Sequence, residues 1–341
     1  MPNLDAILPG RRRNRRALGL VLLIALVPPM ALWALTVGSS QIAPGMWFDA
    51  LMHPDGSREH IVLLDIRLPR MLAGLLVGAQ LAVAGAIMQA VTANPLASPG
   101  LLGINAGAAF AVVLALAFTS IDASGSLVWF AFGGAGVAGG CVYALGSIGR
   151  GGATPLKLAL AGAVLTAFLT SVTTSLLLLD QGTLDNLRLW AAGSLMGRSL
   201  ATVAELAPYG LAGLACALAA ARPIMTLSLG GDVASTVGQN VVRWRLLAGL
   251  LVVVLAGSAV ALAGPVGFVG LVVPHAARML VGADYRWIMA YSAPLGALLV
   301  LVADAGIRWL VGIDLPVGIT MALLGSPVFI ALARRRSGMM R

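Results

Sequence analysis

The chain has 341 residues, of which 59% are hydrophobic and 10% charged, and its formal net charge is +9. A soluble domain of this length carries roughly a quarter charged residues, so the composition excludes a soluble fold and predicts an integral membrane protein. Lipid forces each backbone polar group to be satisfied within its own segment, so we expect spanning helices and an all-α fold. The basic residues cluster at the ends of apolar segments, which argues against nucleic acid as their partner.

Ten apolar segments are long enough to cross a bilayer, at about twenty residues each. They cover residues 17–37, 68–91, 99–119, 126–148, 156–179, 201–221, 244–263, 266–283, 287–310 and 314–333. We expect the third and eighth to be broken, because Pro95, Pro99, Pro265 and Pro274 fall near their starts or inside them.

The distribution of arginine predicts the orientation, since cytoplasmic loops carry an excess of basic residues. Placing the N-terminus in the cytoplasm puts most of the basic residues inside and most of the acidic ones outside. An even number of spans then returns the C-terminus to the same side. The predicted regions are a basic cytoplasmic N-terminus at 1–16, a ten-helix transmembrane domain at 17–333 and a cytoplasmic tail at 334–341.

An internal repeat is visible, because residues 70–77 read RMLAGLLV and residues 245–252 read RLLAGLLV. Each copy continues into a helix rich in alanine and glycine and then into a break rich in glycine and proline. The first copy starts outside and the second inside, which predicts the inverted repeat with broken helices that recurs in transporters.

The stretch from Arg222 to Arg245 is the longest internal run that is too polar to cross a bilayer, and it is flanked by spanning segments. Apolar and polar side chains alternate along it, so we expect a short amphipathic piece on the cytoplasmic side. Its position predicts a coupling segment, at about 222–243, through which another protein moves the membrane part.

Catalytic and metal-binding patterns are missing from the sequence. Lys157 is the only lysine and no glycine precedes it, so a phosphate-binding loop is absent. His53, His60 and His275 lack metal-ligand spacing, and we therefore predict no metal, no cofactor and no enzymatic activity of the chain itself.

Ionisable residues inside spans are candidates for function. Asp304 and Arg308 are four residues apart near the outer end of the ninth span, as in a helical ion pair, although docking of a partner remains open. Arg67 and Arg70 flank the outer start of the second span. We expect them to be exposed and to bind either lipid phosphate or carboxylates of a soluble partner, which we favour.

Several motifs resemble those of the bacterial permeases for ferric siderophores, haem and cobalamin, in the same order from about residue 60 to 333. They are RLPR at 67–70, Gln89, NPLASPGLLG at 94–103, WxxGSL at 190–195, LSLG at 227–230, GPVGFVGLVVPH at 264–275 with Arg278, Asp304 with Arg308, and LPVG at 315–318. The resemblance implies a type II ABC importer of the bacterial inner membrane. Its permease is a homodimer of ten-span subunits, completed by two cytoplasmic ATPase subunits that bind ATP and Mg²⁺ and by one periplasmic substrate-binding protein.

The same resemblance assigns roles to residues by position. By position, the residues that would dock the binding protein are Arg67, Arg70 and Arg308. The residues that would couple to the ATPase are Leu227, Ser228, Leu229, Gly230, Asp232, Val233, Val237 and Gly238. The cytoplasmic gate comprises Asn94, Leu96, Thr154 and Pro155. Two departures are Gly231, where relatives place an acid, and Asp314, which replaces the usual glutamate.

We therefore predict a permease that moves an iron chelate into the cytoplasm by alternating access. Haem is the first expectation for the cargo, a ferric siderophore the alternative, and cobalamin the third. A secondary transporter that uses Asp304 or His275 is the competing class, and a membrane scaffold is another.

Overall fold

The computed structural model describes residues 9–38, 45–53, 55–118, 126–149, 153–179 and 190–338. The elements in these ranges are all helical, which confirms the predicted all-α class. They are α1 (Pro9–Ala25), α2 (Val27–Thr36), α3 (Met46–Met52), α4 (Arg58–Ile61), the π-helix η2 (Val62–Arg67), α5 (Leu68–Val91), the 3-10 helix η3 (Pro99–Leu102), α6 (Ile104–Phe118), α7 (Ser126–Ser147), α8 (Pro155–Leu179), α10 (Leu200–Ala219), α11 (Ala221–Ser228), α12 (Gly231–Thr236), α13 (Val241–Ala263), α14 (Val269–Val281), α15 (Tyr285–Val311) and α16 (Val317–Gly338). Parts of the predicted N-terminus and tail, residues 1–8 and 339–341, lie outside the described residues.

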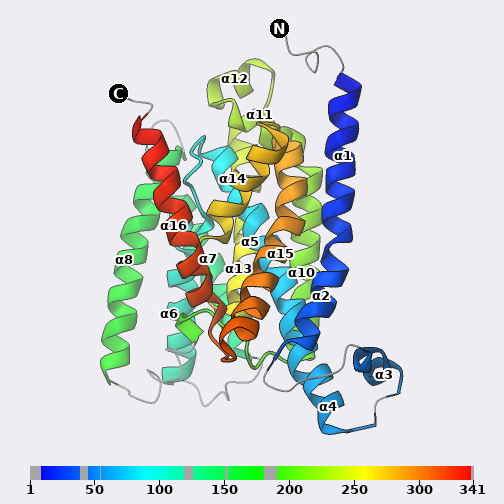
Figure 1. Cartoon of the computed structure of the whole chain (residues 1–341). Coiled ribbons are helices and arrows are strands. Elements are labelled where there is room, and N and C mark those ends of the chain that lie inside the picture. The colour runs from blue at the N-terminus through cyan, green and yellow to red at the C-terminus, as the bar shows by residue number, and fades with distance from the viewer. Residues whose placement is uncertain are drawn as a thin grey trace.

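The long helices form one upright bundle with two distinct ends (Figure 1). Helix α12, the start of α1 and the end of α16 lie at one end, which we call the α12 end. Helices α3 and α4 lie at the opposite end. We call it the arginine end, after Arg67, Arg70 and Arg308.

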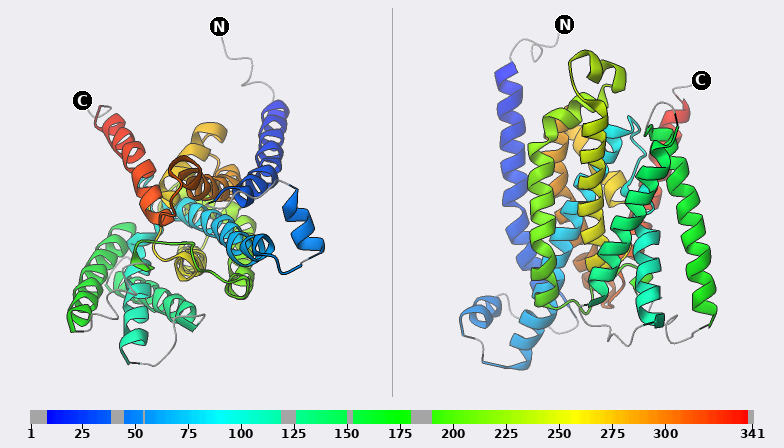
Figure 2. Two further views of the ribbon diagram at one scale, coloured as in Figure 1. Left: turned by 60° about the horizontal axis from the view of Figure 1, so that its bottom comes forward. Right: turned by 180° about the vertical axis from the view of Figure 1, so that it is seen from behind.

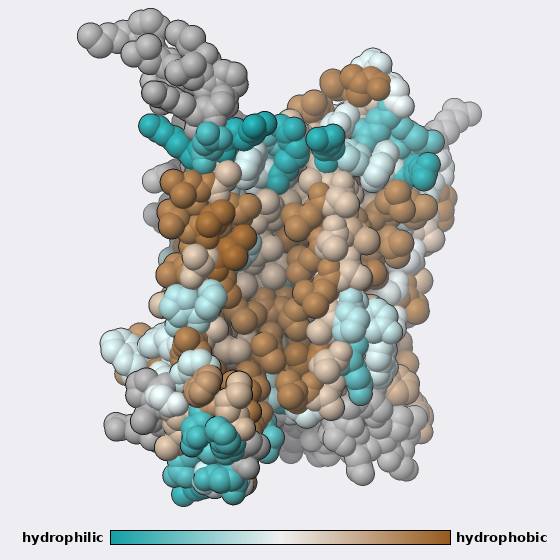
Figure 3. Space-filling view, turned by 90° about the vertical axis from the view of Figure 1, so that its right-hand side faces the viewer, coloured by the Kyte–Doolittle hydropathy of each residue, from teal (hydrophilic) through white to brown (hydrophobic). Residues whose placement is uncertain are grey.

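The bundle carries an apolar band between polar ends, as Figure 3 shows for the face that includes α1. Seven helical segments in the described ranges are long and apolar enough to cross a membrane, and three shorter apolar helices accompany them. The shorter ones are Ile104–Phe118, Val269–Val281 and Val317–Ile330. Together these segments occupy the ten predicted positions.

Both predicted breaks are present. The third span begins as the 3-10 turn η3, and Gly103, with a φ of 69°, separates that turn from α6. Helix α14 begins only after Phe268, which adopts a left-handed φ of 65°. Proline explains the first break, because Pro99 begins η3, whereas Pro274 lies inside α14 without ending it.

Helix α5 is the centre of the bundle and packs against α10, α13, α14 and α15. Glycines allow two of these contacts to bring backbones together. A Cβ on Gly78 would lie 2.1 Å from the carbonyl oxygen of Gly296 in α15. A Cβ on Gly85 would come still closer to the carbonyl oxygen of Gly270 in α14. Small residues at such crossings are how helices pack tightly without a hydrophobic driving force in lipid.

The predicted inverted repeat is visible in the chain path. Helix α5 runs from the arginine end to the α12 end, and α13 runs in the opposite direction (Figure 1). Each is followed by a break and then by a shorter helix, α6 or α14.

Helices α8 and α16 stand at the edge of the bundle (Figure 2). Helix α8 packs mainly against α6, α7 and η3, and α16 mainly against α14 and α15. Large apolar side chains on both remain exposed, among them Leu160 and Leu323.

Candidate functional site

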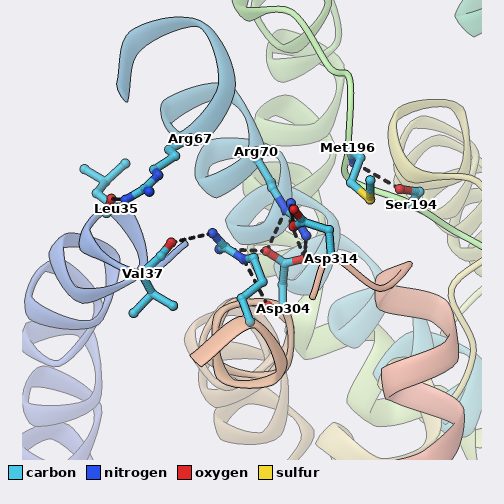
Figure 4. Close-up of polar contacts among 9 residues, drawn as sticks. Leu35, Val37, Arg67, Arg70, Ser194, Met196, Asp304 and Asp314 are labelled. Carbon is cyan, nitrogen blue, oxygen red and sulfur yellow. Dashed lines mark hydrogen bonds and ion pairs between the residues drawn. The ribbon is translucent and has the colours of Figure 1, made fainter. Parts of the chain in front are cut away.

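The arginine end holds a network of buried charges. Arg70 binds Asp304 through two nitrogens, with Nε 2.9 Å from Oδ2 and Nη2 2.8 Å from Oδ1. Arg308 reaches the same carboxylate from one helical turn away, with Nη2 3.1 Å from Oδ2. One carboxylate therefore holds two guanidiniums, and it ties α5 to α15 (Figure 4).

The network also caps the end of α2. Arg67 donates from Nη1 to the carbonyl oxygens of Leu35, at 2.7 Å, and Thr36, at 2.9 Å. Arg308 donates from Nη1 to the carbonyl oxygen of Val37 at 2.7 Å. These carbonyls have no partner within the helix, so the guanidiniums satisfy them and lock α2 against α5 and α15.

The prediction that Arg67 and Arg70 are exposed is wrong. Arg67 is 5% exposed, Arg70 is 6% and Arg308 is 9%, because all three are drawn into these internal bonds. The expected ion pair between Asp304 and Arg308 is present. Arg70 as a second partner of Asp304 has no local sequence signal, since 234 positions separate the two residues.

Asp314 lies on the more open side of the network. Its Oδ1 accepts from Arg70 Nη1 at 2.5 Å, and its side chain is 43% exposed. It borders a cavity of about 350 Å³ that Arg67, Arg70 and Arg308 also line, together with Arg58 and Glu59. The arginines predicted to dock a partner thus meet at one cavity, and part of their charge is already neutralised.

At the opposite end, α11 packs against α5, α13 and α15, and α12 projects above the bundle (Figure 1). Gly230, with a φ of 102°, lets the chain turn between the two short helices. Gln239 Nε2 donates to the carbonyl oxygen of Pro223 at 2.9 Å and closes the segment on itself. The backbone of this projection is therefore internally supported.

The predicted coupling residues fall into an inner and an outer group. Leu227 is 3% exposed and packs inward, and Ser228 Oγ donates to the carbonyl oxygen of Met225. Leu229, Val233 and Val237 are 60%, 46% and 67% exposed. Gly230 is half-buried, and Asp232 and Gly238 are exposed with the outer group. The segment from Leu229 to Val237 therefore exposes three apolar side chains at the α12 end.

The predicted gate residues also lie at the α12 end, where α5 ends and α8 begins (Figure 1). Asn94 Oδ1 accepts from the amide of Leu96 at 3.0 Å, which shapes the turn after α5. Thr154 Oγ1 accepts from the amide of Lys157, and Pro155 is the first residue of α8. In both segments a side-chain oxygen therefore holds a turn of the backbone, and neither segment lies in the interior of a spanning helix.

Among the described residues, no group of three or more His, Cys, Asp or Glu side chains could hold a metal ion.

Residues 22–335 match the FecCD transport family. The chain is 45% identical over 289 residues to the probable siderophore transport system permease protein YfiZ of Bacillus subtilis (strain 168), covering 84% of this chain and 87% of that one. It is 42% identical over 320 residues to the ferric enterobactin transport system permease protein FepD of Escherichia coli (strain K12), covering 94% and 95%.

The fold also matches a solved structure described as a metal-chelate type ABC transporter in an inward-facing conformation. The TM-score is 0.78 at 27% identity, over 93% of this chain and 98% of that chain. The similarity therefore extends over nearly the whole bundle.

Proposed function

Because the chain belongs to the FecCD transport family, we propose that it is the membrane-spanning permease subunit of an ATP-driven importer in a bacterial inner membrane. The α12 end then faces the cytoplasm, together with both termini, and the arginine end faces the periplasm. ATP and Mg²⁺ are bound by a separate ATPase subunit, because the sequence lacks a phosphate-binding loop.

The observation that carries the proposal is the projection of α12 above the bundle. Leu229, Val233 and Val237 present apolar surface outside the bundle, and Asp232 adds one negative charge beside them. A groove on an ATPase that binds this surface would pull the projection when the ATPase closes. The helix bundles would then rock about the breaks before α6 and α14, as in alternating access.

A homodimer is supported by the helices at the edge of the bundle. Leu156, Leu160, Val164 and Phe168 recur every four residues along α8, and each is at least 59% exposed. Leu323 and Leu324 give α16 a similar exposed face. Residues four apart share one face of a helix, so α8 presents a continuous apolar stripe that lipid covers in a single subunit and that a second subunit would cover in a dimer.

Docking of a periplasmic binding protein is proposed for the cavity lined by Arg67, Arg70 and Arg308. These side chains contribute three positive charges, against two negative charges from Asp304 and Asp314. The excess of positive charge favours a partner that offers carboxylates. Because the guanidiniums are already bonded inside the chain, such carboxylates would compete with Asp314, the more exposed of the two acids.

For the cargo we propose a ferric siderophore, the alternative in the sequence analysis, in place of haem, which was its first expectation. The relatives named above are described by siderophore and enterobactin transport, and none of those descriptions mentions haem. The ion-coupled alternative is weakened by the position of Asp304, whose carboxylate already accepts from Arg70 and Arg308.

Substitution at Val237 tests the proposed ATPase contact. Val237→Glu places a charge on the exposed apolar surface, so we expect that the ATPase no longer co-purifies with the permease. Val237→Ile keeps the apolar surface and is the matched control, which should retain the ATPase. Equal recovery of the ATPase with both variants would contradict the proposed contact.

A further inference from the structure

A second cavity of about 500 Å³ lies at the arginine end, beside the charged network. Helices α6 and α7 contribute apolar side chains to its wall, and the loop before α10 contributes Trp190, Met196 and Arg198. Asp314 borders this cavity as well as the docking cavity, so the two are neighbours. Figure 4 shows Ser194 and Met196 on that loop, next to Asp314.

Among the described residues, no carboxylate pairs with Arg198 at this cavity. Its Nε atom is buried and has no hydrogen-bond partner in the part of the chain that the structure describes. Burial lowers the pKa of the Arg198 guanidinium, and no described carboxylate counters that effect. Asp314 lines the same cavity, but its carboxylate is bonded to Arg70. Arg198 as a whole is half-buried, and a buried Nε–H without a partner is costly, so an anion that enters the cavity and accepts from the guanidinium would relieve the cost.

The loop that carries Arg198 is held in place by its own backbone. Gly193 donates to the carbonyl oxygen of Trp190 at 3.0 Å, and Gly318, in α16, donates to the carbonyl oxygen of Gly193 at 2.9 Å. Ser199, directly after Arg198, accepts from the amide of Thr202 at 3.1 Å and caps α10. These bonds fix the backbone on both sides of Arg198, so less backbone entropy is lost when a ligand binds at the cavity that Arg198 and Trp190 line.

The side chains of this cavity suit one class of ferric chelate. Catecholate and carboxylate ligands carry more negative charge than ferric iron neutralises, so their complexes are anions, whereas a tris-hydroxamate complex is neutral. An arginine forms strong, directional bonds with anionic oxygens. Trp190 offers an aromatic surface on which a catechol ring can stack.

We propose that Arg198 and Trp190 form an outer subsite that binds an anionic, catecholate or carboxylate, ferric chelate on its way into the bundle. The inference rests on the proposed import function and specifies its substrate class. A docking contact with a protein partner fits less well, because Arg198 lies within a cavity and its Nε atom is buried.

The test uses the detergent-purified complex with its ATPase and two probes, a ferric tris-catecholate and a ferric tris-hydroxamate built on the same backbone. Quenching of tryptophan fluorescence gives the Kd of each chelate without the binding protein. Loss of a hydrogen bond to a charged group changes affinity by about tenfold or more. Arg198→Gln should therefore raise the Kd of the catecholate about tenfold and change that of the hydroxamate less than about twofold. Arg198→Lys should recover part of the loss.

The results that would overturn the subsite are distinct from failure of the proposed function. Equal Kd values for Arg198→Gln and the unaltered complex, or equal losses for both chelates, would remove Arg198 from chelate recognition. A weakened affinity for the periplasmic binding protein, with unchanged chelate binding, would assign Arg198 to docking. The unaltered complex, reconstituted in vesicles with the periplasmic binding protein, should import a chelate with ATP, and failure to import either one would instead contradict the proposed function.

Discussion

At the scale of single residues, Asp304 determines how the arginine end is held together. It is 3% exposed and accepts from both Arg70 and Arg308, so two buried guanidiniums depend on one carboxylate. The sequence indicated the pair with Arg308, because residues four apart on a helix are neighbours. It could not indicate Arg70, because that contact depends on how α5 packs against α15.

Removal of Asp304 should therefore cost much more stability than removal of Asp314. Asp304→Ala leaves Arg308 without its carboxylate partner and leaves Arg70 with Asp314 alone, and breaking a buried pair in this way typically costs about 3–5 kcal/mol. Asp314→Ala removes a half-exposed partner, for which about 0–1 kcal/mol is expected. The free energy of unfolding in detergent measures both. Similar losses for the two variants would show that Asp304 is not the centre of the network.

At the scale of elements, the packing of α5 against α15 joins the first half of the chain to the second half. The second span was predicted at 68–91, and the structure places α5 at Leu68–Val91. The short helices α3, α4 and η2 were not predicted, because they are too short to carry a spanning signal. The crossing at Gly78 and Gly296 was equally hidden, since the sequence contains 42 glycines and does not indicate which of them touch.

Two glycines of α15 give a matched test of that crossing. A Cβ on Gly296 would lie 2.2 Å from the carbonyl oxygen of Gly78, whereas a Cβ on Gly306 would have nothing within 4 Å. Gly296→Ala should destabilise the protein by about 1–3 kcal/mol through overpacking. Gly306→Ala should be neutral or stabilise it by up to about 1 kcal/mol, because alanine favours a helix. Thermal unfolding measures the stability change in both variants. A Gly296→Ala variant as stable as the unaltered protein would refute the close crossing.

At the scale of the whole molecule, the two ends of the bundle have different chemistry. The arginine end gathers buried charges beside two cavities, and the α12 end presents a small apolar projection. The distribution of basic residues predicted that both termini lie on the same side, and the start of α1 and the end of α16 do lie together at the α12 end. The burial of Arg67 and Arg70 could not be predicted, because their carbonyl and carboxylate partners lie on α2 and α15, far from them in the sequence. In the proposed function, the bundle has no energy source of its own, and a separate ATPase moves it by its contact with α12.

Uptake into proteoliposomes tests that claim most directly. Vesicles containing the permease with its ATPase would receive the periplasmic binding protein and a ferric siderophore on the outside. We predict that uptake requires ATP inside the vesicles and persists when proton and sodium gradients are collapsed. Uptake that proceeds without the ATPase and follows an ion gradient would contradict the account.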